Sequence, residues 1–130
     1  TKETLDKYAI VYLYDVAAHL ESLNCVAKME VPEGAVFIPA HCPVTADVAE
    51  LTAYNREKIL EIADFLEAAC VEPKTLEHLL AETFEHYGLR MNFAQHELIG
   101  STIRSYLTYL EAEGKMEITI TNQYLLYKTL

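Results

Sequence analysis

The chain is poor in basic residues. It carries 10 lysines and arginines against 20 aspartates and glutamates, so its formal net charge at pH 7 is −10. An acidic surface repels the phosphate backbone of nucleic acids and the head groups of anionic lipids. The sequence also lacks an apolar run near the ~18 residues that a membrane-spanning helix needs, and it shows no basic-then-apolar leader. We therefore expect neither nucleic acid nor a membrane to be a partner.

Cysteine is also scarce. The three cysteines, Cys25, Cys42 and Cys70, are an odd number at wide spacings and form no Cys-x-x-Cys pair. This pattern argues against a zinc ribbon and favours a reduced, cytoplasmic setting over a disulfide framework. A glycine-rich phosphate-binding loop is absent as well. Cys42 directly follows His41, but neighbours on a turn often point apart, so we do not expect a cysteine nucleophile.

The apolar content, by contrast, is high. Hydrophobic residues make up 52% of the 130 positions, which predicts a packed core rather than disorder. A break at Val71, Glu72 and Pro73 divides the chain into two parts, residues 1–72 and 73–130. No long flexible linker separates them, so we expect the two parts to pack together.

The pattern of the first part indicates helices around one short strand. Asp15 is a typical N-cap residue, and the apolar positions after it recur every three or four residues, which predicts a helix over residues 15–25. The apolar run at 9–14 is expected to be extended or loop-like. Residues 36–38 predict a buried strand that stops at Pro39, because proline cannot continue a central ladder.

Thr45 is the expected N-cap of a long helix over residues 46–70. At 1.5 Å per residue such a helix is roughly 37 Å long, so its far end should reach into the second part. His41 lies on the turn between the predicted strand and this helix. A rigid layer can hold a histidine there as a metal ligand or catalytic group. A histidine that only hydrogen-bonds within a loop is the alternative.

Three helices and a hairpin are predicted in the second part. Each helix has a polar N-cap residue and a glycine at its end. We expect these helices to begin at Thr75, Asn92 and Ser101 and to end at Gly88, Gly100 and Gly114. Residues 115–120 alternate in polarity as a strand does, and residues 124–128 return after a turn.

Residues 37–44, Phe-Ile-Pro-Ala-His-Cys-Pro-Val, and the helical pattern after them resemble the last metal-ligand segment of the metallo-β-lactamase-fold hydrolases. Residues 3–8 and 15–23 resemble the segment that follows the Gly-Asp metal-ligand step of that family. The resemblance covers roughly residues 1–72 and implies the C-terminal portion of such a fold. The expected class is mostly α (α+β): half of an α/β layer, followed by a winged-helix-like module.

The resemblance implies a hydrolase with a small-molecule substrate. Family members hold two metals, zinc or iron, that activate water for attack on an ester, thioester, amide or phosphodiester. Only His41 remains here as a metal ligand, because the His-x-His-x-Asp-His motif is absent. A catalytic zinc needs about three protein ligands. We therefore expect this chain alone to be inactive, with no catalytic residue and no tightly bound metal.

The predicted helices and hairpin at 75–130 resemble a winged helix. They leave an alternative function open, a protein-interaction or transcription-regulator module. Helices that read DNA carry several Arg, Lys, Asn or Gln. The third predicted helix offers only Arg104, and residues 74–130 carry five basic residues against seven acidic ones. Packing against protein or covering a substrate is therefore favoured over DNA binding.

Self-association, most simply as a dimer, is also expected. A half-built sheet leaves apolar surface uncovered, and such surface is usually buried against a partner. The surfaces expected to be shared are the run at 9–14 and the apolar stripe of the long helix. That stripe consists of Val48, Leu51, Ile59 and Ile62.

Overall fold

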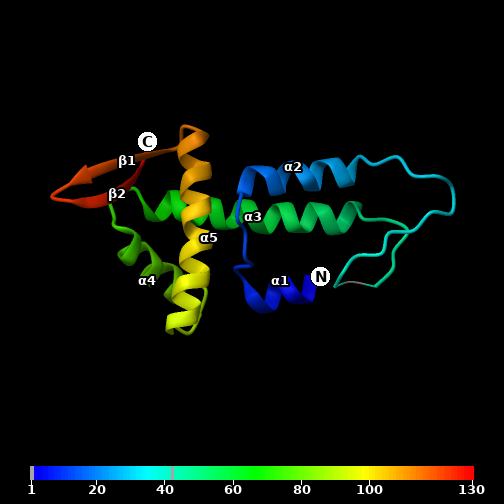
Figure 1. The fold of residues 1–130 in the computed structure, drawn as a ribbon, viewed down its shortest axis with the longest axis horizontal. Helices are drawn as coiled ribbons and strands as arrows, with labels where there is room; N and C mark the ends of the chain where they lie inside the picture. The colour runs from blue at the N-terminus through cyan, green and yellow to red at the C-terminus, as the bar shows by residue number, and fades with distance from the viewer. Residues whose placement is uncertain (1, 42) are drawn as a thin grey trace.

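The computed structural model describes residues 2–41 and 43–130 and is mostly helical (Figure 1). Its elements are α1 (Lys2–Tyr8), α2 (Val16–Ala27), α3 (Ala49–Ala69), α4 (Leu76–His86), α5 (Phe93–Ala112), β1 (Met116–Thr121) and β2 (Tyr124–Thr129). The two strands form an antiparallel hairpin. The predicted mostly-α, α+β class is confirmed. Of the helices in the described ranges, none combines the length and the apolar character that crossing a bilayer requires.

The antiparallel helices α2 and α3 form one end of the molecule (Figure 1). Asp15 caps α2 as predicted, because its carboxylate accepts a hydrogen bond from the backbone N–H of Ala18 at 2.9 Å. Val16 and Leu20 form the buried face of α2. The chain between α2 and α3, described over residues 28–41 and 43–48, extends beyond both helices at the end farthest from the hairpin.

α3 begins at Ala49, later than the predicted residue 46. The Thr45 hydroxyl does not cap the helix. It donates to the carbonyl oxygen of Asp47 at 2.7 Å and accepts from the Asp47 N–H at 3.2 Å. The Asp47 carboxylate accepts from the Ala49 N–H at 2.7 Å. The prediction of Thr45 as the N-cap was wrong because a local turn takes up its hydroxyl.

The buried strand predicted at residues 36–38 is not formed. Phe37 makes an isolated antiparallel bridge with Thr45, with hydrogen bonds of 2.7 and 3.1 Å. Val36 and Ile38 remain 53% and 80% exposed. A strand is buried only by neighbouring strands and a covering layer, and in the described ranges this run pairs only with the other arm of its own loop.

The region after residue 73 contains two helices where three were expected. Thr75 and Asn92 are N-caps as predicted, with side-chain oxygens that accept from backbone N–H groups at 3.4 and 3.0 Å. α5, however, continues unbroken through Gly100 and Ser101. A methyl group at Gly100 would lie 3.4 Å from Cδ1 of Leu80 on α4. The glycine therefore permits a close helix contact rather than a turn.

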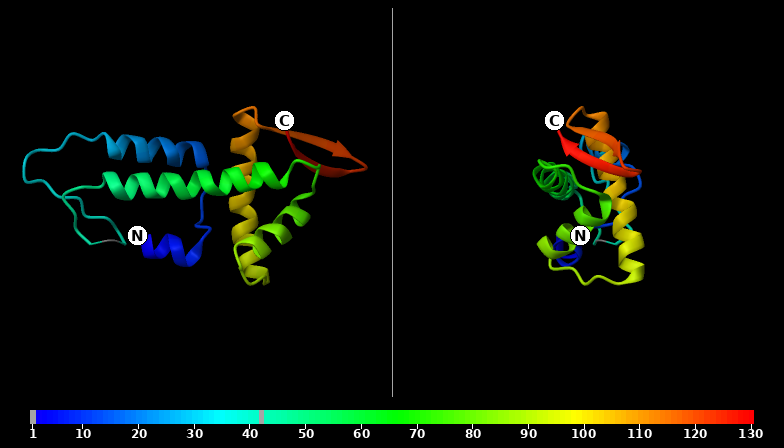
Figure 2. Two further views of the ribbon diagram at one scale, coloured as in Figure 1. Left: turned by 180° about the vertical axis from the view of Figure 1, so that it is seen from behind. Right: turned by 90° about the vertical axis from the view of Figure 1, so that its left-hand side faces the viewer.

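The C-terminal half of α3 completes a three-helix arrangement with α4 and α5 (Figure 2). This end of α3 also contacts β2. The expectation that the long helix reaches into the second part is thus confirmed.

β1 and β2 pair in continuous register over their whole length, as the alternation predicts. Asn122 and Gln123 form the turn with φ values of 51° and 68°. Two-residue hairpin turns of type I′ require positive φ at both positions. On the other side of β2, Lys74 bridges Tyr127 through hydrogen bonds of 3.0 and 2.8 Å.

A continuous hydrophobic core crosses the predicted boundary at residues 72–73. Its fully buried side chains include Leu66 of α3, Leu79 of α4 and Tyr106 of α5. Met116 of β1 packs into the same cluster. The expectation that the two parts pack together is therefore met, while their division into two domains stays a prediction.

The surfaces expected to be shared in a dimer are used only in part within the chain, because Tyr12 and Tyr14 of the run at 9–14 remain 55% and 81% exposed. Ile10 and Leu13, from the run at 9–14, belong to the core. Ile59 and Ile62, from the stripe of the long helix, belong to it too, and Val48 is only 8% exposed. These side chains are not free to cover a second copy.

Candidate functional site

His41, the predicted metal ligand, lies on an exposed turn of the loop between α2 and α3. The Phe37–Thr45 bridge ties the two arms of this loop together. Among residues 2–41 and 43–130, no group of three His, Cys, Asp or Glu side chains could hold a metal ion. Within the described residues, His41 therefore has no set of neighbouring side chains that would complete a metal site. Cys42, considered above as a nucleophile, lies outside the described residues.

A groove of about 380 Å³ opens beside this loop. Its walls come from α2, from α3 and the residue before it, and from the arm of the loop that leads to His41. The lining residues are His19, Leu23, Val26, Phe37, Ile38, Pro39, Val48, Leu51, Thr52 and Asn55. The groove is therefore mostly apolar, with a histidine and an amide at its border, and it holds no acid–base pair.

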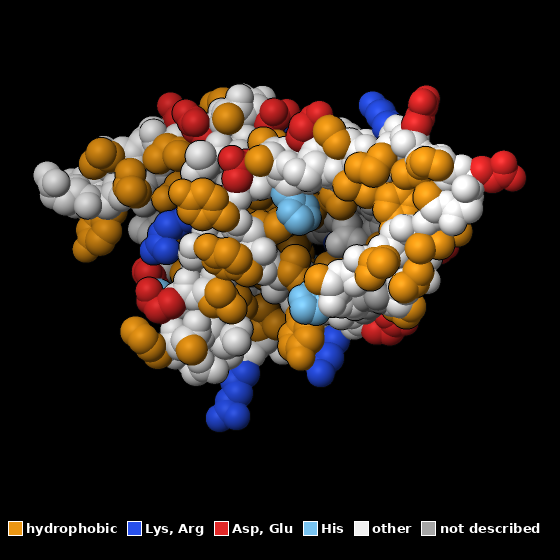
Figure 3. Space-filling view, turned by 45° about the vertical axis from the view of Figure 1, so that its right-hand side comes forward, with side chains coloured by type: hydrophobic (Ala, Val, Ile, Leu, Met, Phe, Trp, Pro, Cys, Tyr) orange, Lys and Arg blue, Asp and Glu red, His pale blue; other side chains and the backbone are white. Residues whose placement is uncertain are grey.

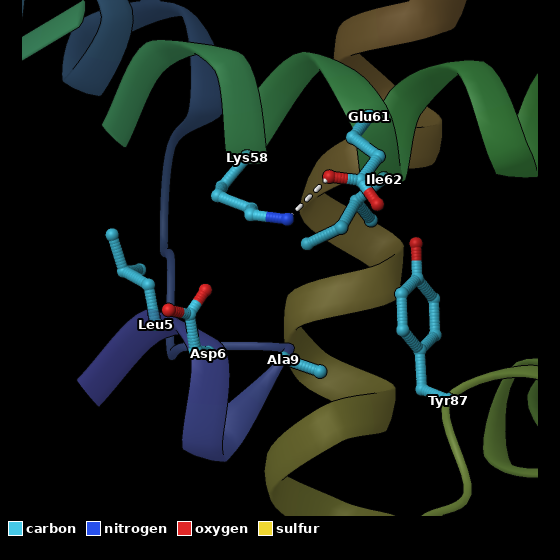
Figure 4. Close-up of a pocket in the computed structure, with 7 residues that line it drawn as sticks. All are labelled: Leu5, Asp6, Ala9, Lys58, Glu61, Ile62 and Tyr87. Carbon is cyan, nitrogen blue, oxygen red and sulfur yellow. Dashed lines mark hydrogen bonds and ion pairs between the residues drawn. The ribbon is translucent and has the colours of Figure 1, made fainter. Parts of the chain in front are cut away.

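A smaller cavity of about 160 Å³ lies between α1, α3 and the end of α4 (Figure 4). In Figure 4 the Lys58 ammonium reaches toward Glu61, at 2.8 Å, while Asp6 points up from α1. Asp6 also accepts a hydrogen bond from Tyr54. Lys58 and Glu61 thus pair with each other and Asp6 with the Tyr54 hydroxyl, so each charged group that lines this cavity has a partner.

Burial keeps one thiol and two tyrosine hydroxyls in their neutral forms. Burial raises the pKa of the Cys70 thiol to about 11 and that of Tyr87 to about 12. It raises the pKa of Tyr106 as well. The hydroxyls of Tyr87 and Tyr106 have no hydrogen-bond partner within the described residues. Near neutral pH these groups are protonated, so none of them is a nucleophile.

Two histidines of the second part, His86 and His96, contact side chains of other helices. His86 stacks on Phe65 with ring centroids 4.2 Å apart. His96, on α5, places Nε2 3.0 Å from the carboxylate of Glu77 and Nδ1 3.0 Å from that of Glu97. Hydrogen bonds to Glu77, and then to Glu97, raise the pKa of His96 above its usual 6.5.

Arg104 lines a groove of about 500 Å³ between α5 and the start of α2. The hydroxyl of Ser105, the next residue of α5, donates to the Tyr14 carbonyl oxygen at 2.8 Å and so ties the two segments together. Arg104 itself is exposed at the border of this groove.

Sequence reasoning placed His41 on its turn but missed both grooves and the His96 cluster. Their residues lie far apart in sequence, and no local pattern joins them. Glu77 and His96, for example, are 19 positions apart. No known family model, curated protein or solved structure matches this chain.

Proposed function

We propose that this chain is the C-terminal portion of a metal-dependent hydrolase with the metallo-β-lactamase fold, carrying a winged-helix-like module. The position of His41 carries the proposal. It stands on an exposed turn, closed by the Phe37–Thr45 bridge, in the loop that extends beyond α2 and α3. A histidine in this position is accessible to a metal ion whose other ligands come from outside this chain.

The surroundings of that turn support the same proposal. Val36 and Ile38 have strand composition but are largely exposed. The apolar groove between α2 and α3 opens next to them. An intact hydrolase of this fold would lay further strands against this surface, and those strands would bury both side chains.

The donor set of this chain does not fit a complete metal site. A hydrolytic zinc site uses about three protein ligands. Among the described residues, no two further His, Cys, Asp or Glu side chains lie where they could bind a metal together with His41. Any further ligands for zinc or iron would come from sequence outside this chain. No catalytic step is therefore assigned to its residues, and the chain alone is expected to lack hydrolase activity.

Metal content tests the role of His41. We expect the coding sequence upstream of Thr1 to supply a His-x-His-x-Asp-His motif and a Gly-Asp step. The protein that includes them should retain about two metals after dialysis, and His41→Ala should lose at least one. His78→Ala, at an exposed position on α4, is the matched control and should lose none. Absence of the upstream motifs, or unchanged metal content in His41→Ala, would contradict the proposal.

A second candidate is a winged-helix module that acts in protein interaction or regulation. The Lys74–Tyr127 bridge favours it, because Lys74 then occupies the place of a short strand between α3 and α4. The order helix, short strand, two helices and hairpin is that of a winged helix. In this alternative His41→Ala changes no metal content, so the same measurement separates the two candidates.

A further inference from the structure

We propose that the open edge of β1 is a self-association surface. A second copy of this chain would add its own β1 there, antiparallel and across a two-fold axis, so that the two hairpins form one sheet. This inference goes beyond the proposed hydrolase, and it places the expected dimer on a surface that sequence reasoning did not consider.

The first step is the open edge itself. β2 has β1 on one side and Lys74 on the other, whereas β1 has no second neighbour among the described residues. The N–H of Leu130 donates to the carbonyl oxygen of Lys115 at 3.0 Å, so the peptide groups of Lys115 face β2. Because this orientation alternates along an antiparallel strand, Ile118 and Ile120 direct their peptide groups toward the open edge.

The second step is the composition of this edge, in which Glu117 is the one charged side chain. Monomeric proteins commonly protect an edge strand with proline, a bulge or lysine. The sequence of β1, Met-Glu-Ile-Thr-Ile-Thr, contains neither proline nor lysine, and its register has no bulge. The edge is therefore competent to pair with another strand.

The third step is the apolar face beside the edge. Met116 and Tyr127 are buried at the base of the hairpin, and the same face continues outward through Ile118, Ile120 and Leu125. These three side chains are 40%, 73% and 51% exposed. Figure 3 shows hydrophobic side chains spread over the visible face of the molecule, at the hairpin end and at the opposite end alike. A paired strand would extend this face and cover part of it.

Charge identifies the occupant as a second copy. Within the hairpin Glu117 lies directly opposite Lys128, so the hairpin is neutral although the chain carries −10. A charged peptide finds no complementary charge there. A two-fold axis at Ile118 places Ile118 against its own copy and Glu117 against Thr119 of the second copy. An axis at Glu117 would instead bring two carboxylates together, which disfavours that register.

Sedimentation velocity of the full chain tests the proposal. We expect the average mass to rise from 14.7 kDa toward twice that value between about 1 and 100 µM. Ile118→Lys places two ammonium groups face to face and should raise the dissociation constant about 100-fold or more. Thr119→Lys adds the same charge one residue away. It meets Glu117 of the second copy, so the dimer should persist.

Circular dichroism verifies that each variant is folded. Ile118→Thr is a milder change that keeps the β-branched shape and should weaken the dimer about 10-fold. A monomer up to about 100 µM in the unsubstituted chain overturns the proposal. So does a folded Ile118→Lys or Ile118→Thr variant that dimerises normally. Equal loss of the dimer in Ile118→Lys and Thr119→Lys overturns the two-fold register.

Discussion

At the scale of single residues, His96 is the side chain whose ionisation the fold controls through two partners. One carboxylate, that of Glu77, comes from the first turn of α4, and the other, that of Glu97, comes from α5. A neutral imidazole has one N–H, whereas the imidazolium donates from both ring nitrogens. The protonated form therefore satisfies both carboxylates and links the beginnings of the two helices.

This arrangement predicts a pH dependence of stability. The pKa of His96 is raised in the folded state above its usual 6.5. Its stabilisation is therefore complete below about pH 6.5 and is lost as the pH rises through the folded-state pKa. We expect the free energy of unfolding to fall as the pH rises over a range that begins at about 6.5, by a small amount because the carboxylates are exposed. Urea denaturation across this range measures the change.

The matched variants are His96→Gln and His78→Gln. His96→Gln should flatten that part of the pH profile. His78→Gln, at an exposed position on the neighbouring helix, should keep the slope of the unsubstituted chain. If the profiles of His96→Gln and the unsubstituted chain coincide, the link between the helices has no energetic role.

Local chemistry at residue scale was largely readable from the sequence. Asp15, Thr75 and Asn92 cap their helices as predicted, because an N-cap needs only a short polar side chain and a following helical pattern. The prediction of Thr45 as an N-cap failed for an equally local reason, because its hydroxyl hydrogen-bonds to the backbone of Asp47 instead.

At the scale of elements, the prediction failed where a residue had two uses. Gly100 followed by Ser101 fits a turn and a new helix, but the structure uses the glycine for contact with Leu80 inside one long helix. Only the position of α4 distinguishes these uses, and no local pattern contains it. The hairpin was predicted correctly because its alternation and its polar turn are both local.

The composition and placement of α5 predict that the chain does not bind duplex DNA specifically. Arg104 is the one Lys or Arg in α5, and it borders the groove shared with α2. Fluorescence anisotropy at ~0.15 M salt should give a dissociation constant of about 10⁻⁴ M or weaker. Arg104→Ala should leave this value unchanged. Submicromolar binding that is lost in Arg104→Ala would show that α5 reads DNA after all.

At the scale of the whole molecule, the sequence could not show what each apolar segment packs against. Residues 36–38 have the composition of a buried strand, yet Ile38 is 80% exposed. The run at 9–14 lacks a regular element, yet Ile10 and Leu13 enter the core. Of the candidate site, only His41 and its turn could be predicted, because both grooves depend on helix packing.

The core also couples the two predicted parts. The N–H of Thr129, in β2, donates to the carbonyl oxygen of Cys70 at 2.8 Å. Leu66 of α3 is fully buried in the cluster that contains Val16 of α2 and Met116 of β1. Loss of packing at Leu66 should therefore destabilise the elements on both sides of residues 72–73.

We expect residues 1–72 and 73–130 to unfold as one cooperative unit. Leu66→Ala removes buried methyl groups and should lower the free energy of unfolding by about 2–5 kcal/mol. Hydrogen exchange should then show the same loss of protection in α2 and in the hairpin, because both depend on global opening. Leu98→Ala, at a position on α5 that is 46% exposed, should change little. If Leu66→Ala weakens only α2 and α3 while the hairpin keeps its protection, the chain consists of two separately folding domains.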